Sequence, residues 1–196
     1  MVSDVITISS SGTNMDAALE ETAKVAAYKS LSRRDTLHMR LLAEEMMGMM
    51  RSITHETNGE FWIESGQNEY ELHLKVETIV DAEIRQRLLS TSSSGKNEAS
   101  RSFMGKLREF FFRGPDENIA SYQTPLVNAG IAANVKEWQW SMTRYQENIS
   151  AAKSEKPEAA EAWDELEKSV VRNVADDVKI SIKGWTTEMI IVKKLG

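Results

Sequence analysis

Residues 60–77 read EFWIESGQNEYELHLKVE, and this stretch decides the fold. Between Tyr70 and Val76, apolar residues occupy every second position, and charged residues or histidine occupy the positions between them. A period of two is that of a β-strand with one buried face and one wet face. Residues 61–63 predict a second strand, and Gly-Gln-Asn at 66–68 predicts a short turn between the two. The stretch therefore predicts an antiparallel hairpin.

The residues before this hairpin predict one strand and two helices. Residues 5–8 are a short apolar run that predicts an opening strand. Asn14 is typical of an N-cap, and apolar residues at helical spacing predict a helix over 15–30. A second helix with an apolar side begins at Ser32 or Asp35 and ends near the Asn-Gly turn signal that precedes the hairpin.

The residues after the hairpin predict more helix around a low-complexity loop. A short helix is expected over 81–89, a Ser- and Gly-rich loop over 90–97, and a further helix over 98–112. Residues 116–134 contain proline and glycine and predict no regular element.

The last third of the chain predicts two helices and a closing hairpin. Asn134 and Glu137 have the spacing of a capping box, which predicts a helix that ends at about residue 152. Pro157 suits the first turn of the next helix, where its missing N–H costs nothing. Residues 178–182 alternate between apolar and polar, and 186–192 supply the partner strand.

Together these elements predict an α+β fold, a two-layer α/β sandwich. Its sheet is mixed but mostly antiparallel, because hairpins join most neighbouring strands. Helices cover one face of the sheet, since its alternating strands have one apolar face to bury. We expect a single domain over 1–196 with a helical insertion at about 114–175.

The composition excludes several function classes. The chain has 196 residues and a net charge of −6, which argues against nucleic-acid binding. It has no cysteine, which excludes thiolate metal sites and fits a reducing compartment. Its longest apolar runs are too short to cross a bilayer, and residues 1–12 lack the features of a secretory signal. We therefore expect a cytoplasmic protein that binds neither membranes nor nucleic acid.

Four local features occur in an order that one known superfamily also has. They are a helix containing 41–50, the hairpin at 60–77, a Ser/Gly loop that leads into 103–106, and a last hairpin at 178–195 whose turn carries Gly-Trp-Thr-Thr. In this order the chain resembles the GHKL superfamily of histidine-kinase-like ATPases (the Bergerat fold), nearest to the anti-sigma serine kinase type. The resemblance covers about 5–112 and 176–195, and it implies a regulatory domain that binds ATP or ADP.

The resemblance implies a catalytic glutamate on the helix at 41–50. The family has a Glu there that orients a nucleophile and, one helical turn later, an Asn that holds magnesium. In this sequence Glu45 matches the Glu, but Met49 stands in the Asn position. Magnesium prefers oxygen ligands and a thioether is soft, so we expect no metal site and weak or no phosphotransfer. The alternative interpretation is that Glu45 is a surface charge and Met49 fills the core.

The resemblance also implies that one of the two residues that follow the long strand contacts the adenine base. Glu77 or Thr78 follows that strand at about the point where the family has an Asp against the adenine amino group. The family's Asp-x-Gly-x-Gly pattern is absent, so neither glycine needed for close approach of the backbone is present. An intact adenine pocket is therefore not expected.

The implied phosphate contacts come from the low-complexity loop and from the last hairpin. Gly95 and Lys96 precede a predicted helix and offer N–H groups and one cation to an anion. Gly105 matches one glycine of the family's second glycine box, and Thr187 is expected near the nucleotide. The alternative is a flexible loop, with Gly105 allowing only close helix packing.

The histidines and aromatic residues give weaker signals. His38, His55 and His73 are scattered, no pair has metal-ligand spacing, and each is interpreted as a surface residue. On a helix, Trp138 and Tyr145 would share one face, which would either bind a partner or dock on the domain's own core, and we favour the core.

Two functions therefore stand as hypotheses. The first is a nucleotide-binding regulatory domain with ATP or ADP as its ligand. The alternative is a non-catalytic protein-interaction module that kept the fold and lost nucleotide binding. A regulatory protein and a second copy of the chain are the candidate partners.

Overall fold

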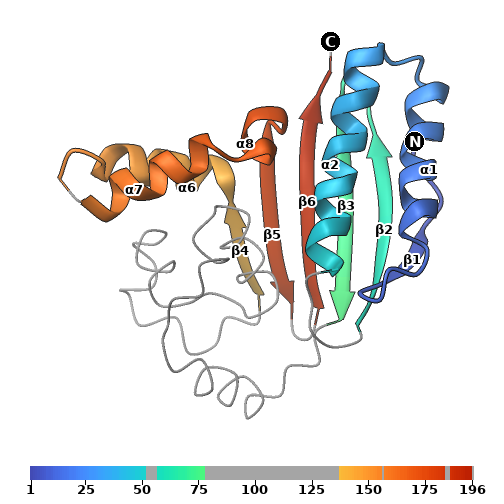
Figure 1. The fold of residues 1–196 in the computed structure, drawn as a ribbon, viewed down its shortest axis with the longest axis horizontal. Coiled ribbons are helices and arrows are strands. Elements are labelled where there is room, and N and C mark those ends of the chain that lie inside the picture. The colour runs from blue at the N-terminus through green and yellow to red at the C-terminus, as the bar shows by residue number, and fades with distance from the viewer. Residues whose placement is uncertain (52–56, 78–136, 156, 184–185, 196) are drawn as a thin grey trace.

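The protein was analysed as a computed structural model that describes residues 1–51, 57–77, 137–155, 157–183 and 186–195. In order, the elements are β1 (Ile6–Ser9), α1 (Met15–Tyr28), α2 (Arg33–Arg51), β2 (Asn58–Ser65), β3 (Glu69–Glu77), β4 (Glu137–Ser141), α6 (Met142–Ala152), α7 (Pro157–Glu167), α8 (Val170–Val174), β5 (Asp177–Lys183) and β6 (Thr186–Lys194) (Figure 1). The predicted elements at 81–89, 90–97 and 98–112 lie outside the described residues.

The six described strands form one sheet in the order β1-β2-β3-β6-β5-β4, and all neighbours are antiparallel. The predicted hairpin is confirmed as β2–β3, with Ile63 opposite Leu72. The closing hairpin, β5–β6, joins it through β3 and β6, where Leu72 also faces Ile191. The α+β sandwich predicted from the sequence is therefore confirmed.

The hydrophobic core lies between the sheet and the helices on one of its faces (Figure 1). Leu72, Leu74 and Val76 of β3 point to this face and are fully buried. The face of α2 turned to the core carries Met39, Leu42, Met46 and Met50. Full burial of such a side chain stabilises the fold by roughly 1.5–3 kcal/mol. The alternation seen in the sequence thus decides which face of the sheet the helices cover.

The helix starts follow local hydrogen bonding. Ser32 is the N-cap of α2, since its Oγ accepts a hydrogen bond from the Asp35 N–H at 3.1 Å. Asn14 precedes α1 with a left-handed backbone (φ 58°), but its side chain makes no cap hydrogen bond. Instead, Asn14 Nδ2 donates to the carbonyl oxygen of Thr7 at 2.9 Å. Of the two predicted starts for the second helix, Ser32 is confirmed.

The predicted helix over 134–152 is wrong in its first part. Residues 137–141 form β4, an edge strand in which Trp140 pairs with Ile180. Glu-Trp-Gln-Trp-Ser has a period of two and two aromatic residues, and this strand signal outweighs the capping box. The helix begins only at Met142, after Ser141 accepts a hydrogen bond from the Arg144 N–H.

Of the two residues predicted to share a helix face, Trp138 lies on β4 and Tyr145 on α6, so the prediction of a shared helix face is wrong, whereas Tyr145 is buried in the core, as we favoured. Trp140 lies on β4 and Tyr145 on α6, and their ring centroids are 5.9 Å apart. Both side chains are buried. Pro157 occupies the first position of α7, as predicted.

Candidate functional site

Eight residues were predicted to act at a nucleotide site, and the structure describes four of them. Thr78, Gly95, Lys96 and Gly105 lie outside the described residues. The other four, Glu45, Met49, Glu77 and Thr187, come from α2, β3 and β6. The C-terminal half of α2, the end of β3 and the start of β6 meet at one end of the sandwich, which is the lower end in Figure 1.

Cross-strand register explains this convergence. Gly59 of β2, Val76 of β3 and Thr187 of β6 lie in one row across the sheet. The terminal methyl group of Met50 packs over Gly59, so the last turns of α2 lie on this row. Glu77 follows Val76 and ends β3. The C-terminal half of α2 and the ends of two central strands therefore frame one region.

Of the four described candidates, Glu45 is the one on α2 that carries a titratable group. Its side chain is half-buried. Burial raises the pKa of the Glu45 carboxyl above its ordinary value, and the neighbouring charge of Glu44 adds to this effect. A half-buried carboxyl with a raised pKa is a candidate hydrogen-bonding group for a ligand.

The other three residues differ in burial. Met49 is only 4% exposed and belongs to the core cluster, as the alternative interpretation expects. Thr187 is buried on the helix-covered face, whereas Glu77 is exposed at the strand end. Because side chains alternate along a strand, Thr187, which pairs with Val76, and Glu77 point to opposite faces, so on the helix-covered face the described candidates offer the Thr187 hydroxyl and the Glu45 carboxyl.

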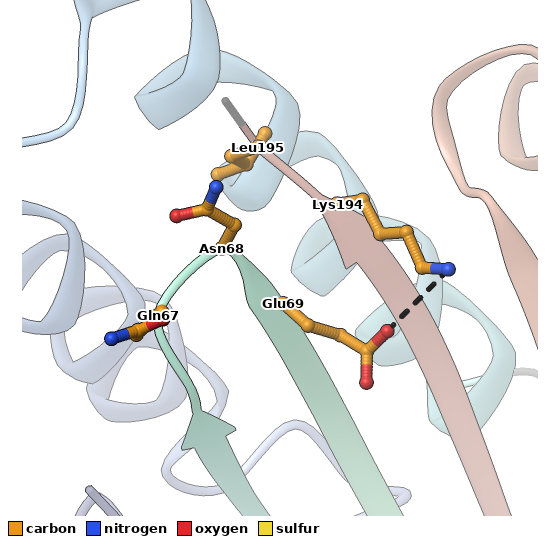
Figure 2. Close-up of a pocket in the computed structure, with 5 residues that line it drawn as sticks. All are labelled: Gln67, Asn68, Glu69, Lys194 and Leu195. Carbon is orange, nitrogen blue, oxygen red and sulfur yellow. Dashed lines mark ion pairs between the residues drawn. The ribbon is translucent and has the colours of Figure 1, made fainter.

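A hollow of about 460 Å³ lies at the opposite end of the sheet (Figure 2). It is lined by Gln67, Asn68, Glu69, Lys194 and Leu195. Its charged edge is the Lys194–Glu69 pair, 3.7 Å apart with both side chains exposed. Exposed pairs of this kind contribute at most about 1 kcal/mol. None of the predicted site residues lines this hollow.

A second group of polar side chains lies on the sheet face opposite to α1 and α2. Its centre, His73 of β3, is only 5% exposed, and the ring of Trp62 stacks on it at 4.6 Å between centroids. His73 Nδ1 lies 3.0 Å from Oε1 of Glu188. His73 Nε2 lies 3.8 Å from Oε1 of Glu64 and 3.8 Å from Oε2 of Glu71. Both separations exceed hydrogen-bond length, and buried Nε2 has no hydrogen-bond partner.

The interpretation of His73 as a surface residue is therefore wrong, and sequence reasoning missed this cluster. The signal that could have found it is the hairpin register. A three-residue turn at 66–68 sets Glu64 opposite Glu71 and Trp62 opposite His73, all on one face. Spacing along the chain does not reveal ligands that come from two paired strands.

No family model, no curated protein and no solved structure matches this chain. In the parts of the chain that the structure describes, no helix is both long and apolar enough to cross a membrane.

Proposed function

We propose that the chain is a regulatory domain that binds ATP or ADP at the end of the sandwich where α2, β3 and β6 meet. The observation that carries the proposal is that the C-terminal half of α2 packs on the paired ends of β3 and β6, so that Glu45 and Thr187 belong to the helix-covered side at this end, whereas Glu77 points to the other face. Glu45, Met49, Glu77 and Thr187 are the described positions that the resemblance to histidine-kinase-like ATPases implies.

The architecture supports the proposal. A strand, two helices and a hairpin are followed, after a long segment, by a second hairpin that pairs with the first. The helix that carries Glu45 packs on the sheet beside the end of β3. Fold alone does not give function, so the proposal depends on the side chains at this end.

The chemistry of these side chains favours binding over phosphotransfer. The half-buried Glu45 carboxyl can hydrogen-bond the base or the sugar of a nucleotide, and the Thr187 hydroxyl, which is 2% exposed, can do so only where the ligand reaches the buried end of β6. Phosphoryl transfer depends on positioned metal ions and charge, and buried Met49 supplies no oxygen ligand one turn after Glu45. We therefore expect nucleotide affinity that changes little with magnesium, and weak or no turnover.

Isothermal titration with ATP and with ADP, in the presence and absence of magnesium, tests this function. We expect one binding event and a matching rise in melting temperature, because a ligand that binds only the folded state stabilises it. Glu45→Gln and Thr187→Val should each weaken binding several-fold, since each removes one polar group with little change in size.

Glu20→Gln is the control, because Glu20 is an exposed carboxyl on α1 and does not contribute to the raised pKa of Glu45. It should leave nucleotide affinity unchanged. No heat and no thermal shift at millimolar nucleotide would remove the proposal. The burial of Met49 would then favour the non-catalytic interaction module, whose test is co-purification of a partner.

A further inference from the structure

We propose that His73, Glu64 and Glu71 form a binding site for a divalent transition-metal ion, with Zn²⁺ as its representative. The site lies on the sheet face opposite to α1 and α2, whereas Thr187 of the proposed nucleotide site points to the helix-covered face. It does not depend on the proposed nucleotide function. Its centre is the unpartnered Nε2 of a side chain that is only 7% exposed.

The hydrogen bond on the other ring nitrogen fixes the tautomer of His73. An ionised carboxylate only accepts hydrogen bonds, so Nδ1, which lies 3.0 Å from Glu188 Oε1, carries the proton. In the neutral ring, Nε2 is then an acceptor whose lone pair faces Glu64 and Glu71. In metal sites, the histidine nitrogen that does not bind the metal usually donates a hydrogen bond to a carboxylate or a similar acceptor. This partner orients the ring and raises the basicity of the nitrogen that binds the metal.

The carboxylates around Nε2 favour a cation at this position. Glu64 and Glu71 are directly opposite each other on paired strands, an arrangement that destabilises a sheet when both side chains are ionised. Glu188 adds a third carboxylate beside the same ring. Lys179 Nζ lies 3.5 Å from Oε1 of Glu71, which leaves Oε2 of Glu71 facing His73. A divalent ion between the three donors would offset this excess of negative charge.

The distances fit a first-row ion after an adjustment of Glu64. Bonds of about 2.0–2.2 Å from Zn²⁺ to nitrogen and oxygen place neighbouring tetrahedral ligands roughly 3.3–3.5 Å apart. The donor atoms of Glu64, Glu71 and His73 lie within 4.8 Å of one another, and both carboxylates are 3.8 Å from Nε2. The Glu64 side chain is 47% exposed, and its Oε1, which accepts a hydrogen bond from Trp62 Nε1 at 3.2 Å, would move by up to about 1.5 Å to close the site. Three protein ligands leave a fourth position for water or substrate.

The donor set selects the class of metal. An imidazole nitrogen suits Zn²⁺, Cu²⁺, Ni²⁺ and Fe²⁺, whereas Mg²⁺ and Ca²⁺ prefer oxygen ligands alone. One histidine with two carboxylates therefore favours a first-row transition metal. The ring of Trp62 lies nearly parallel to the imidazole, at 11°, and shields one side of the site from water.

Isothermal titration of the full chain with Zn²⁺ at neutral pH tests the site. We expect one ion per chain, with affinity lowered at least tenfold by Glu64→Gln and by Glu71→Gln. Glu188→Gln should weaken binding by roughly 10–100-fold, the usual effect of losing a second-shell carboxylate. Glu60→Gln is the matched control, because Glu60 lies on the same strand and face with similar exposure, and it should change nothing.

A nitrogen-15 spectrum of the three histidine side chains gives a second measurement that needs no variant. Zn²⁺ should shift the Nε2 resonance of His73, while Nδ1 keeps its proton toward Glu188. Absence of Zn²⁺ binding overturns the proposal. So does binding that leaves the His73 resonances unchanged, or that Glu60→Gln weakens as much as Glu71→Gln.

Discussion

Asp176 is a single residue that joins the start of β5 to the end of β6. Its Oδ2 accepts hydrogen bonds from the Lys194 N–H at 2.7 Å and from Lys193 Nζ at 3.0 Å. Burial alone would raise the pKa of Asp176, but the hydrogen bonds and charges of the two lysines hold it below its ordinary value. Because the folded pKa is below the unfolded one, this stabilisation is present above the unfolded pKa and is lost as pH falls through the folded pKa.

We therefore predict that Asp176→Asn lowers the free energy of unfolding at neutral pH and has little effect below the folded pKa of Asp176. Asparagine keeps an acceptor for the Lys194 N–H and loses only the charge. The effect should be under about 1 kcal/mol, since the side chain is 39% exposed and solvent screens the pair. Urea denaturation across the acid range measures it. A difference that stays constant with pH would contradict the assignment.

At the same scale, the sequence indicated some candidate residues and missed others for a physical reason. Glu45 was predicted through the resemblance to histidine-kinase-like ATPases, whose motif places two residues one helical turn apart, and such a spacing can be read along the chain. His73 was missed because its neighbours Glu64 and Glu188 come from other strands. The role of Glu188 depends on the pairing of β3 with β6, which no local pattern reveals.

At the scale of elements, replacing either of two glycines with alanine is predicted to change the stability of the protein in opposite directions. A methyl group added to Gly59 in β2 would lie 3.1 Å from the carbonyl oxygen of Lys75, which belongs to the rigid sheet. Gly59→Ala should therefore destabilise the protein by about 1–3 kcal/mol. Gly48 of α2 has no neighbour within 4 Å of that position, so Gly48→Ala should stabilise the helix by about 0.5–1 kcal/mol.

Thermal or urea denaturation of the two variants beside the parent protein checks this pair. A stabilising effect of Gly59→Ala would contradict the close contact between that position and the Lys75 carbonyl oxygen. The comparison also explains which elements the sequence could predict. β2 and β3 have clear alternation and one turn, whereas residues 134–141 carry a capping box and an alternating pattern at once, and local signals cannot decide between them.

At the scale of the whole molecule, the order of the strands could not be derived from the sequence in detail. Hairpins follow from short turns, but the contact between β3 and β6 joins residues more than a hundred positions apart. Each alternating strand could pair equally well with several others on the basis of its pattern alone. What decides the order is how the helices α1, α2 and α8 share one apolar face, which is a property of the assembled fold.

This shared core leads to the prediction that the C-terminal helices and the sheet unfold together as one cooperative unit. Ile149 of α6 is fully buried in the same cluster as Leu42 of α2 and Leu72 of β3, and α8 contacts α2. If these residues form one cooperative unit, Ile149→Ala should lower the free energy of unfolding by about 2–5 kcal/mol. Tryptophan fluorescence and far-ultraviolet circular dichroism should then report the same shifted midpoint.

Amide hydrogen exchange in β2 and β3 provides the stricter measurement. These strands lie far from Ile149 along the chain, so their exchange accelerates only when unfolding of the C-terminal helices is coupled to unfolding of the sheet. We expect the slowest amides of β3 to exchange faster in Ile149→Ala by the factor that corresponds to the lost stability. A defect in a shared core must weaken every element that packs in that core. Unchanged amide exchange in β3, together with two separate optical transitions, would therefore mean that the C-terminal helices fold as an independent unit.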